Sequence, residues 1–502
     1  MGTRAFGKTK RKVSRRNFMK LSNRRALRVP ARASLGFTLA GIFAKGIGVL
    51  TTPLFSRLLR AEEYGLYSLY LTWLGIFSVA ATLGITGSVL YRGIQKYRAD
   101  TDAFLSSAAT SLALTFCLSL GIYLLFSEAI NRFTGLTTLL TLFLFMQIGA
   151  NLSLALFSSR CRYLYRPLPY ALVTLGCDVL SAGLSLLLIR YAPHPETARI
   201  YGLLIASLVF AVPLTYLCYR RGKCLFRKEH LAFLFPFALS LFPHYAATIL
   251  LAEGGRAVIG RRLGRAALAG YGIASALGLS LSLLSGGIGA AYQPWVMRKA
   301  AAGETEKIAP ITDLLARLFT LLSCLLMLLF PEIFSLLAPA EYRTSLPAAL
   351  PLACSVLPHF LASMLAGIHL TREEVRPVSA VTLAVAGASL LADALFVPRY
   401  GAVASGFVTL GGAYLLFFLR LFTVRKKGIC GVIFLWRTVG LLAAAPPFAL
   451  LVYVLFPYVA VRLILFALLL PTVFFLGRRV LAALKETKAD IPPSPAGVIE
   501  NE

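Results

Sequence analysis

Four basic residues lie inside or just beyond long apolar runs, where their charges could bind an anion. Lys45 stands in the middle of the run 34–56 and Arg57 follows it, while Arg256 and Arg262 follow a later run. A lysine facing lipid at the bilayer centre would cost roughly 2.5–3.5 kcal/mol, so Lys45 should face protein or a wet cavity. Arginine matches the paired oxygens of a phosphate group. We expect these side chains to line an anion-accepting cavity; the alternative for the arginines near 256 is a solvated loop.

Three further ionisable residues, Asp178, His244 and Asp393, fall in apolar surroundings and could carry a proton or a small ion. Ionisable groups within membrane helices are costly and usually functional. The alternative for each is a polar group satisfied at a helix contact. The eight cysteines form no CxxC pair, and no GxxxxGK[ST] phosphate loop occurs. No metal site, no cofactor and no ATP hydrolysis are therefore expected.

Apolar helices must position these residues. The 502-residue chain is 58% hydrophobic and only 14% charged, with a mean hydropathy of +0.75. Apolar runs long enough to cross a bilayer recur along its length, which predicts an all-α polytopic membrane protein with about 14 transmembrane helices. The expected spans lie near residues 34–56, 65–89, 105–126, 136–158, 168–189, 201–219, 231–252, 268–296, 311–330, 347–370, 378–397, 402–420, 432–456 and 459–477.

The net charge of +30 is distributed by side of the membrane and does not indicate nucleic acid as a partner. Most of the 51 basic residues fall in the N-terminal tail, in every second loop after it and in the C-terminal tail. Cytoplasmic loops carry such an excess of Lys and Arg. Both termini are therefore expected in the cytoplasm, with residues 1–33 and 478–502 as cytoplasmic tails; the first, rich in Arg, would be attracted to anionic lipids.

The chain contains an internal repeat. RLLRAEEYGLYS at 57–68 aligns with RLGRAALAGYGIAS from residue 262, and VTL at 173–175 recurs at 381–383. The nearly constant offset corresponds to six spans, an even number, so the two copies share one orientation. This predicts two pseudo-symmetric six-helix lobes, 34–219 and 220–430, followed by two additional spans at 431–477. A central cavity between such lobes would be lined by the first, second, seventh and eighth spans.

Several short segments resemble the oligosaccharide flippases of the polysaccharide transport family, which belongs to the superfamily of the MATE exporters and the lipid II flippase. The resemblance covers roughly residues 34–425 and rests on many modest matches: Thr52-Pro53, Ser56-Arg57-Leu58-Leu59, Glu62-Glu63-Tyr64-Gly65, Leu83-Gly84-Ile85, Arg92, Pro331-Glu332-Ile333, Glu341-Tyr342 and the run from Phe396 to Gly406. Family members often show Asp-Arg near the end of the seventh span. Here Gly255-Arg256 stands there, so the arginine is kept and the acid is not.

The resemblance implies a flippase and not an enzyme. It implies that undecaprenyl-pyrophosphate-linked oligosaccharide moves from the cytoplasmic to the outer leaflet of a bacterial inner membrane, alongside other polysaccharide assembly proteins. A MATE-type drug or cation antiporter and a lipid II flippase are the nearer alternatives. A membrane polysaccharide polymerase or glycosyltransferase is the alternative of a different class, but such an enzyme would be expected to have a large extramembrane loop or clustered acids.

Overall fold

The computed structural model describes residues 36–44, 46–191, 194–371 and 374–489, and these residues form helices and no strand. Thirteen helices are long and apolar enough to cross a membrane, and the count reaches 14 when the bent pair Arg265–Gly278 and Leu281–Gly289 is taken as one span. The two parts of this pair meet at 47°. The predicted all-α polytopic fold with about 14 spans is confirmed. Lys45 and both predicted tails, apart from residues 478–489, lie outside the described residues.

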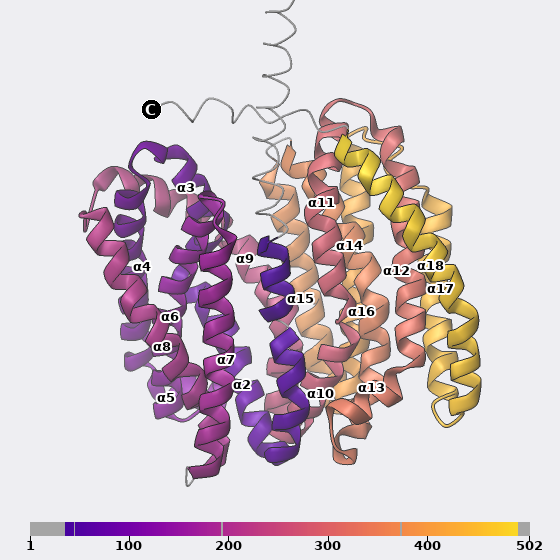
Figure 1. The fold of residues 1–502 in the computed structure, drawn as a ribbon, viewed down its shortest axis with the longest axis horizontal. Coiled ribbons are helices and arrows are strands. Elements are labelled where there is room, and N and C mark those ends of the chain that lie inside the picture. Colours follow the sequence, from indigo (N-terminus) through magenta and orange to yellow (C-terminus); the bar gives the residue numbers. More distant parts are fainter. Residues whose placement is uncertain (1–35, 45, 192–193, 372–373, 490–502) are drawn as a thin grey trace, which may run out of the picture.

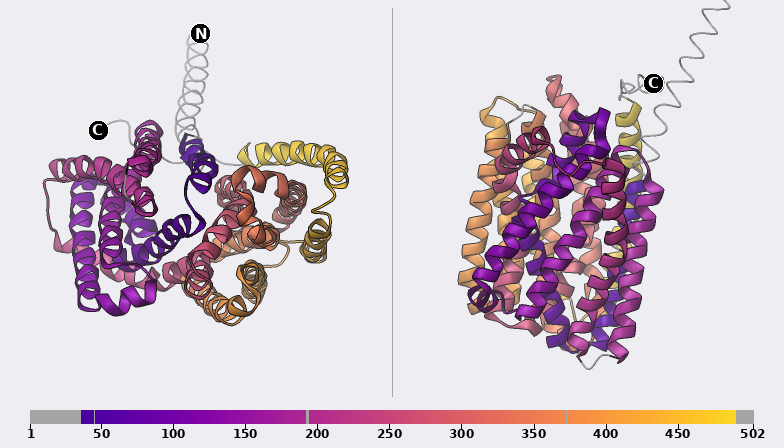
Figure 2. Two further views of the ribbon diagram at one scale, coloured as in Figure 1. Left: turned by 90° about the horizontal axis from the view of Figure 1, so that it is seen from below. Right: turned by 90° about the vertical axis from the view of Figure 1, so that its left-hand side faces the viewer.

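The helices form two bundles (Figure 1). The first bundle, the N-lobe, holds the first span Gly36–Leu58, α2 Ala61–Thr82, the π-helical turn η1 Ile85–Val89, α3 Leu90–Lys96, α4 Thr101–Leu125, α5 Ser127–Thr134, α6 Thr138–Tyr163, α7 Pro167–Tyr191 and α8 Pro195–Gly222. The second, the C-lobe, holds α9 Lys228–Arg262, α10 Arg265–Gly278, α11 Leu281–Ala301, α12 Ile308–Leu328, α13 Phe330–Leu337, η4 Ala340–Ala348, α14 Ala349–Thr371, α15 Val375–Tyr400 and α16 Ala402–Lys426. The helices α17 Leu435–Val454 and α18 Val459–Ala489 pack against the outside of the C-lobe, mainly on α12 (Figure 2).

The two ends of the bundle differ in charge, as the loop pattern predicts. We call the end that carries Arg220, Arg221, Arg425 and Lys426 the basic face and the other end the opposite face. In Figure 1 the basic face is uppermost; the first span runs away from it and α18 runs back toward it. The described chain therefore leaves and returns to the same face.

Helix α9 connects the lobes and contacts both of them. Near its start at the basic face, the His230 ring lies 4.5 Å from the Tyr97 ring and 5.3 Å from the Phe104 ring of the N-lobe. Its remaining length packs mainly on α15 of the C-lobe and on α2. Pro236 and Pro243 lie inside this 35-residue helix, and a proline removes one helical hydrogen bond and favours bending. These two positions can absorb movement between the lobes.

At the opposite face the lobes are joined by hydrogen bonds. Ser56 Oγ donates to Leu337 O at 2.8 Å, and an Arg57 Nη donates to Ser335 O at 3.2 Å. Arg265 likewise donates across the lobes, to Gly135 O at 3.2 Å. The two sequence repeats meet here, because Gly65 of α2 packs directly on the backbone of α10. The cavity described below is therefore closed toward this face by contacts between the lobes.

The seventh span extends beyond the bounds 231–252 that the sequence predicts. The arginine-rich segment between the seventh and eighth spans is helical, because α9 continues through Arg262 and α10 begins at Arg265. The turn is made by Leu263 and by Gly264, whose φ of +90° suits glycine. Consequently Arg256 lies on a helix wall, almost two turns from the helix end, and not in a solvated loop.

Candidate transport cavity

The C-lobe encloses a cavity of about 970 Å³. Helices α9, α10, α11, α14, α15 and α16 line it, and Ser88 is the contribution of the N-lobe among the described residues. Of the four spans expected to line a central cavity, the seventh (α9) and eighth (α10 and α11) do so, the second contributes Ser88 at its end, and the first contributes no described residue. The polar and ionisable lining consists of Ser88, His244, Tyr245, Thr248, Glu253, Arg256, Tyr271, Ser275, Ser282, Ser285, Tyr292, Gln293, His359, Ser363, Ser379, Thr382, Thr409 and Arg420.

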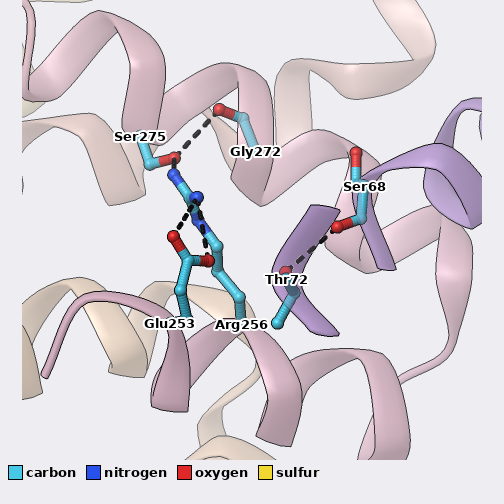
Figure 3. A network of polar contacts seen from close by, with 6 residues as sticks. All are labelled: Ser68, Thr72, Glu253, Arg256, Gly272 and Ser275. Carbon is cyan, nitrogen blue, oxygen red and sulfur yellow. Dashed lines mark hydrogen bonds and ion pairs between the residues drawn. The ribbon is translucent and has the colours of Figure 1, made fainter. Parts of the chain in front are cut away.

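Arg256 is held toward the cavity by two neighbours (Figure 3). Its Nη1 donates to both carboxylate oxygens of Glu253, at 3.3 and 3.2 Å, one helical turn earlier on α9. Its Nη2 donates to Ser275 Oγ on α10 at 2.9 Å, and that hydroxyl donates to Gly272 O. The Arg256 side chain stays 31% exposed. Glu253 offsets the positive charge of Arg256, but the guanidinium of Arg256 stays accessible from the cavity.

Asp393 occupies the space beside Gly255. It is 4% exposed on α15, and its Oδ2 lies 3.0 Å from where a Cβ of residue 255 would stand. Its Oδ1 is buried without a hydrogen-bond partner, as is the nearby Ser405 Oγ. Family members often have an aspartate at the position of Gly255. Here the carboxyl group of Asp393 on α15 reaches the same place from another helix. Asp393 is not among the residues that line the cavity, so it lies behind the wall that carries Arg256.

Arg420 is the cavity residue that sequence reasoning missed. It is 5% exposed on α16 and donates to Ala362 O and to Thr382 Oγ1, both at 2.9 Å. Its Nε is buried without a partner. His244 of α9, predicted from sequence, and His359 of α14 line the same cavity within electrostatic range of Arg420.

The remaining predicted site residues lie elsewhere. Arg57 is exposed at the opposite face, where it bonds to Pro53 O and Ser335 O. Arg262 is exposed at the last residue of α9, and Asp178 is half-buried on α7 in the N-lobe. The structure therefore brings Arg256 and His244 to one cavity, keeps Asp393 directly behind it, and leaves Arg57, Arg262 and Asp178 outside it.

Two helical lobes of membrane-spanning length, with a cavity lined mainly by the second lobe, are an arrangement found in secondary transporters. The fold is similar to that of the lipid II flippase MurJ in its inward closed conformation, with a TM-score of 0.63 and 15% identity over 89% of this chain and 99% of that one. It is also similar to an inward-facing multidrug resistance MATE family transporter of the MOP superfamily, with a TM-score of 0.55 and 15% identity over 80% of this chain and 98% of that one. At these identities the similarity shows the fold.

Residues 32–299, more than half of the chain, match the family model described as polysaccharide biosynthesis protein, and the chain belongs to this family. It is 25% identical over 320 residues to an uncharacterized membrane protein of Haemophilus influenzae, which covers 61% of this chain and 73% of that protein. It is 29% identical over 137 residues to the "Probable low-salt glycan biosynthesis flippase Agl15" of Haloferax volcanii, covering 26% of this chain and 28% of that protein. The chain is therefore a member of the polysaccharide biosynthesis protein family with the fold seen in MurJ and in MATE transporters, and the family resemblance seen in the sequence is confirmed.

Proposed function

We propose that this transporter moves undecaprenyl-pyrophosphate-linked oligosaccharide from the cytoplasmic to the outer leaflet of a bacterial inner membrane, for assembly of envelope polysaccharide. The charged head group passes through the C-lobe cavity while the polyprenyl tail stays in the bilayer. The basic face is cytoplasmic under the positive-inside rule, so both termini are cytoplasmic. Alternating access arises as the lobes rock about α9 and the bent pair of α10 and α11.

The observation that carries this proposal is the sign of the charge in the cavity. Its described ionisable lining holds two arginines, two histidines and one carboxylate, Glu253, and that carboxylate is already paired with Arg256. The charge that remains unpaired in the lining is therefore positive, and it lies on Arg420. In a medium of low dielectric constant such a surplus favours an anion strongly, and arginine suits phosphate oxygens.

The positive charge of the cavity also argues against the alternative of a MATE-type drug or cation antiporter. A MATE-type exporter of cationic drugs would favour an acidic cavity, whereas here the acid is neutralised and the excess is basic. Lipid II shares the polyprenyl-pyrophosphate of the proposed cargo, so the charge does not separate these two. We therefore propose the pyrophosphate as the recognised group and the oligosaccharide as the cargo favoured by membership of the polysaccharide biosynthesis family.

Lys45, Arg57 and Arg262 are proposed to meet the cargo at other stages of the cycle. Arg57 and Arg262 lie at the opposite face, where the head group would leave the protein. Lys45 falls in the first span and is proposed from the sequence alone. Asp178, His244 and Asp393 are proposed as candidates for coupling to a proton or an ion.

The proposal is tested in cells whose own copy of this gene is deleted. Arg256→Ala and Lys45→Ala should each reduce surface polysaccharide at least tenfold, with lipid-linked oligosaccharide accumulating in the cytoplasmic leaflet. Arg132→Ala, an exposed arginine on α5, is the matched control and should export normally. Immunoblots of membrane fractions check that all variants insert. Normal export by both Lys45→Ala and Arg256→Ala would contradict the anion cavity.

A further inference from the structure

Arg420 is a buried cation whose charge no described side chain neutralises. Its two Nη groups bond to neutral oxygens, of Ala362 and Thr382, and its Nε has no partner. Within the described parts of the chain, the ion pairs join other residues. Burying a charge costs several kcal/mol unless an opposite charge or hydrogen bonds compensate for it. A buried arginine left in this condition on a cavity wall is a site prepared for an anion.

The groups around Arg420 fit the same ligand. His244 Nδ1 and Ser379 Oγ are also buried without a hydrogen-bond partner, and both residues line the cavity. Together with Arg420 Nε they supply three unsatisfied polar groups from α9, α15 and α16. The single described acid of the lining, Glu253, is held by Arg256. Unsatisfied polar groups without a competing carboxylate match the several oxygens of a phosphate or pyrophosphate.

Arg420 and Arg256 lie near opposite ends of the cavity. Arg420 precedes the basic-face end of α16, at Lys426, by six residues, and Arg256 precedes the opposite-face end of α9, at Arg262, by six residues. At 1.5 Å per residue each lies about 9 Å from its end of the bundle. Across the 25-residue α16 this separates them by roughly 20 Å along the bundle axis. One pyrophosphate cannot span that distance, so the two arginines form separate sites.

A second cavity, nearer the basic face, adjoins the cavity that Arg420 lines. It lies between α9 and α15, has a volume of about 770 Å³, and shares Ser379 with the main cavity. Its lining includes Arg376 and Lys427, and Lys427 is paired with Glu374 at 2.7 Å. A charged head group that enters here would meet Arg420 before it meets Arg256.

The geometry points to Arg420, with His244 and Ser379, as a loading site that binds the phosphate groups of the cargo on the basic-face side, ahead of a second site at Arg256. This inference rests on the proposed function and deepens it. Arg420 offers its full charge, whereas Arg256 shares its charge with Glu253. Binding is therefore tighter at the loading site than at Arg256 in this conformation, and Glu253 helps the second site to release the anion.

The test measures binding of farnesyl pyrophosphate to the full-length protein in phosphatidylcholine nanodiscs by calorimetry. Arg420→Gln should weaken binding at least tenfold, because it removes the charge and the guanidinium fork while keeping a polar side chain. Arg420→Lys should bind more tightly than Arg420→Gln but less tightly than the wild type, since lysine keeps the positive charge but lacks the two parallel N–H donors of the guanidinium. Arg425→Gln, an exposed arginine on the same helix, is the control and should bind as the wild type does. Inorganic pyrophosphate should compete weakly, and replacing part of the phosphatidylcholine with phosphatidylglycerol should not compete.

A map of the wild-type protein with farnesyl pyrophosphate provides a second measurement that needs no variant. Phosphate density should contact the Arg420 guanidinium; density elsewhere in the cavity would overturn the inference. Unchanged affinity in a folded Arg420→Gln protein would also overturn it, as would inorganic pyrophosphate or phosphatidylglycerol binding as tightly as farnesyl pyrophosphate. Arg420-dependent binding in a protein that moves no lipid-linked oligosaccharide would support the site and contradict the proposed function. Transport without Arg420-dependent binding would support the proposed function and contradict the loading site.

Discussion

Asp393, which lies behind the cavity wall, is more deeply buried and less well paired than Arg256, which lies on that wall. Arg256 reaches the cavity with a paired charge, while Asp393 is buried beside Gly255 with one oxygen unsatisfied. Such a carboxyl group pays a large desolvation cost when it ionises, so its charge depends on what stands next to it. Asp393 is therefore the coupling candidate that the geometry favours over Asp178, which lies on the peripheral helix α7.

Asp393→Asn keeps the shape of this side chain and removes its ability to ionise. If Asp393 exchanges a proton or an ion during each cycle, transport should fall about tenfold and lose its dependence on the pH or ion gradient. Glu128→Gln, which changes an exposed carboxylate on α5, is the control and should keep both rate and gradient dependence. The measurement is the transport rate in proteoliposomes with and without an imposed gradient. A gradient dependence that survives in Asp393→Asn would remove this residue from the coupling step.

At the residue scale, sequence reasoning found Arg256 and His244 because each interrupts an apolar stretch. It missed Arg420 because the segment LFFLRLFTVRKKG ends in a basic cluster, and Arg420 reads as the first residue of that cluster. The helix in fact continues to Lys426. The four apolar or small residues between Arg420 and Arg425 are the signal that one more helical turn follows. No periodicity shows that Ala362 and Thr382 bury the guanidinium, since this depends on contacts between distant helices.

At the element scale, the close approach of α2 and α10 holds the opposite face shut. A Cβ on Gly65 would overlap the Arg265 carbonyl, so only glycine permits this contact. Helices α2 and α10 contain the two copies of the sequence repeat, which therefore marks the place where the lobes touch. Closure at this face and the cavity on the other side of it describe a conformation closed at the opposite face.

Gly65→Leu should prevent this closure and shift the protein toward a state open at the opposite face. In a background without the eight native cysteines, labelling of Ser68→Cys by an impermeant maleimide should rise severalfold, and transport should fall. Gly121→Leu on α4 is the control, because its Cβ would meet no atom within 4 Å. Equal labelling of the two leucine variants would show that the α2–α10 contact does not control access.

The last two helices are fixed to the C-lobe by a nearly buried ion pair. Arg462 of α18 is 1% exposed and donates to Glu332 of α13 at 2.7 and 2.6 Å, and to Leu328 O at 2.7 Å. These hydrogen bonds hold the pKa of Glu332 below its ordinary value of 4.5. Removing one partner of a fully buried pair costs roughly 3–5 kcal/mol, and the partial exposure of Glu332 reduces that figure.

Glu332→Gln should therefore lower the free energy of unfolding by about 2 kcal/mol at neutral pH. Because the native pKa is depressed, this contribution is complete above pH 4.5 and is lost as the pH falls through the native value. Thermal unfolding in detergent should thus distinguish variant from wild type at pH 7 and bring them together in acid. Glu128→Gln, an exposed carboxylate on α5, should match the wild type throughout. A pH-independent difference would assign the effect to packing alone.

At the scale of elements the sequence predicts most of what the structure shows, because hydropathy and helix length are local properties. It predicts the position of every span, including the two that Pro446, Pro447 and Pro471 interrupt. It does not predict that α9 contacts both lobes, nor that its end is helical beyond Glu253. Both depend on contacts between distant parts of the chain: α9 packs on α2, α10 and α15, and near its end Arg256 and Arg261 donate to Ser275 Oγ and Phe133 O.

At the scale of the whole molecule, the basic residues and the cavity lie along the route proposed for the cargo head group. In the proposed function the basic face attracts an anionic head group and an anionic lipid surface, the cavity holds an arginine near each end, and contacts between the lobes close the opposite face. The sequence repeat predicts the two lobes but suggests a cavity shared equally between them. In the structure the cavity is lined mainly by the C-lobe, beside the bend between α10 and α11, and among the described residues the N-lobe contributes Ser88.

The most direct test of the central claim is the movement of a fluorescent polyprenyl-pyrophosphate-linked trisaccharide in proteoliposomes, followed by dithionite quenching of the label that reaches the outer leaflet. We expect the wild-type protein to move it at least tenfold faster than empty vesicles do, and the double variant Arg256→Gln, Arg420→Gln to move it no faster than they do. We also expect a neutral polyprenyl glycoside to stay in place. Equal movement of the neutral and pyrophosphate-linked lipids, or movement of neither while a quaternary ammonium drug is exchanged, would contradict a cavity built for phosphate.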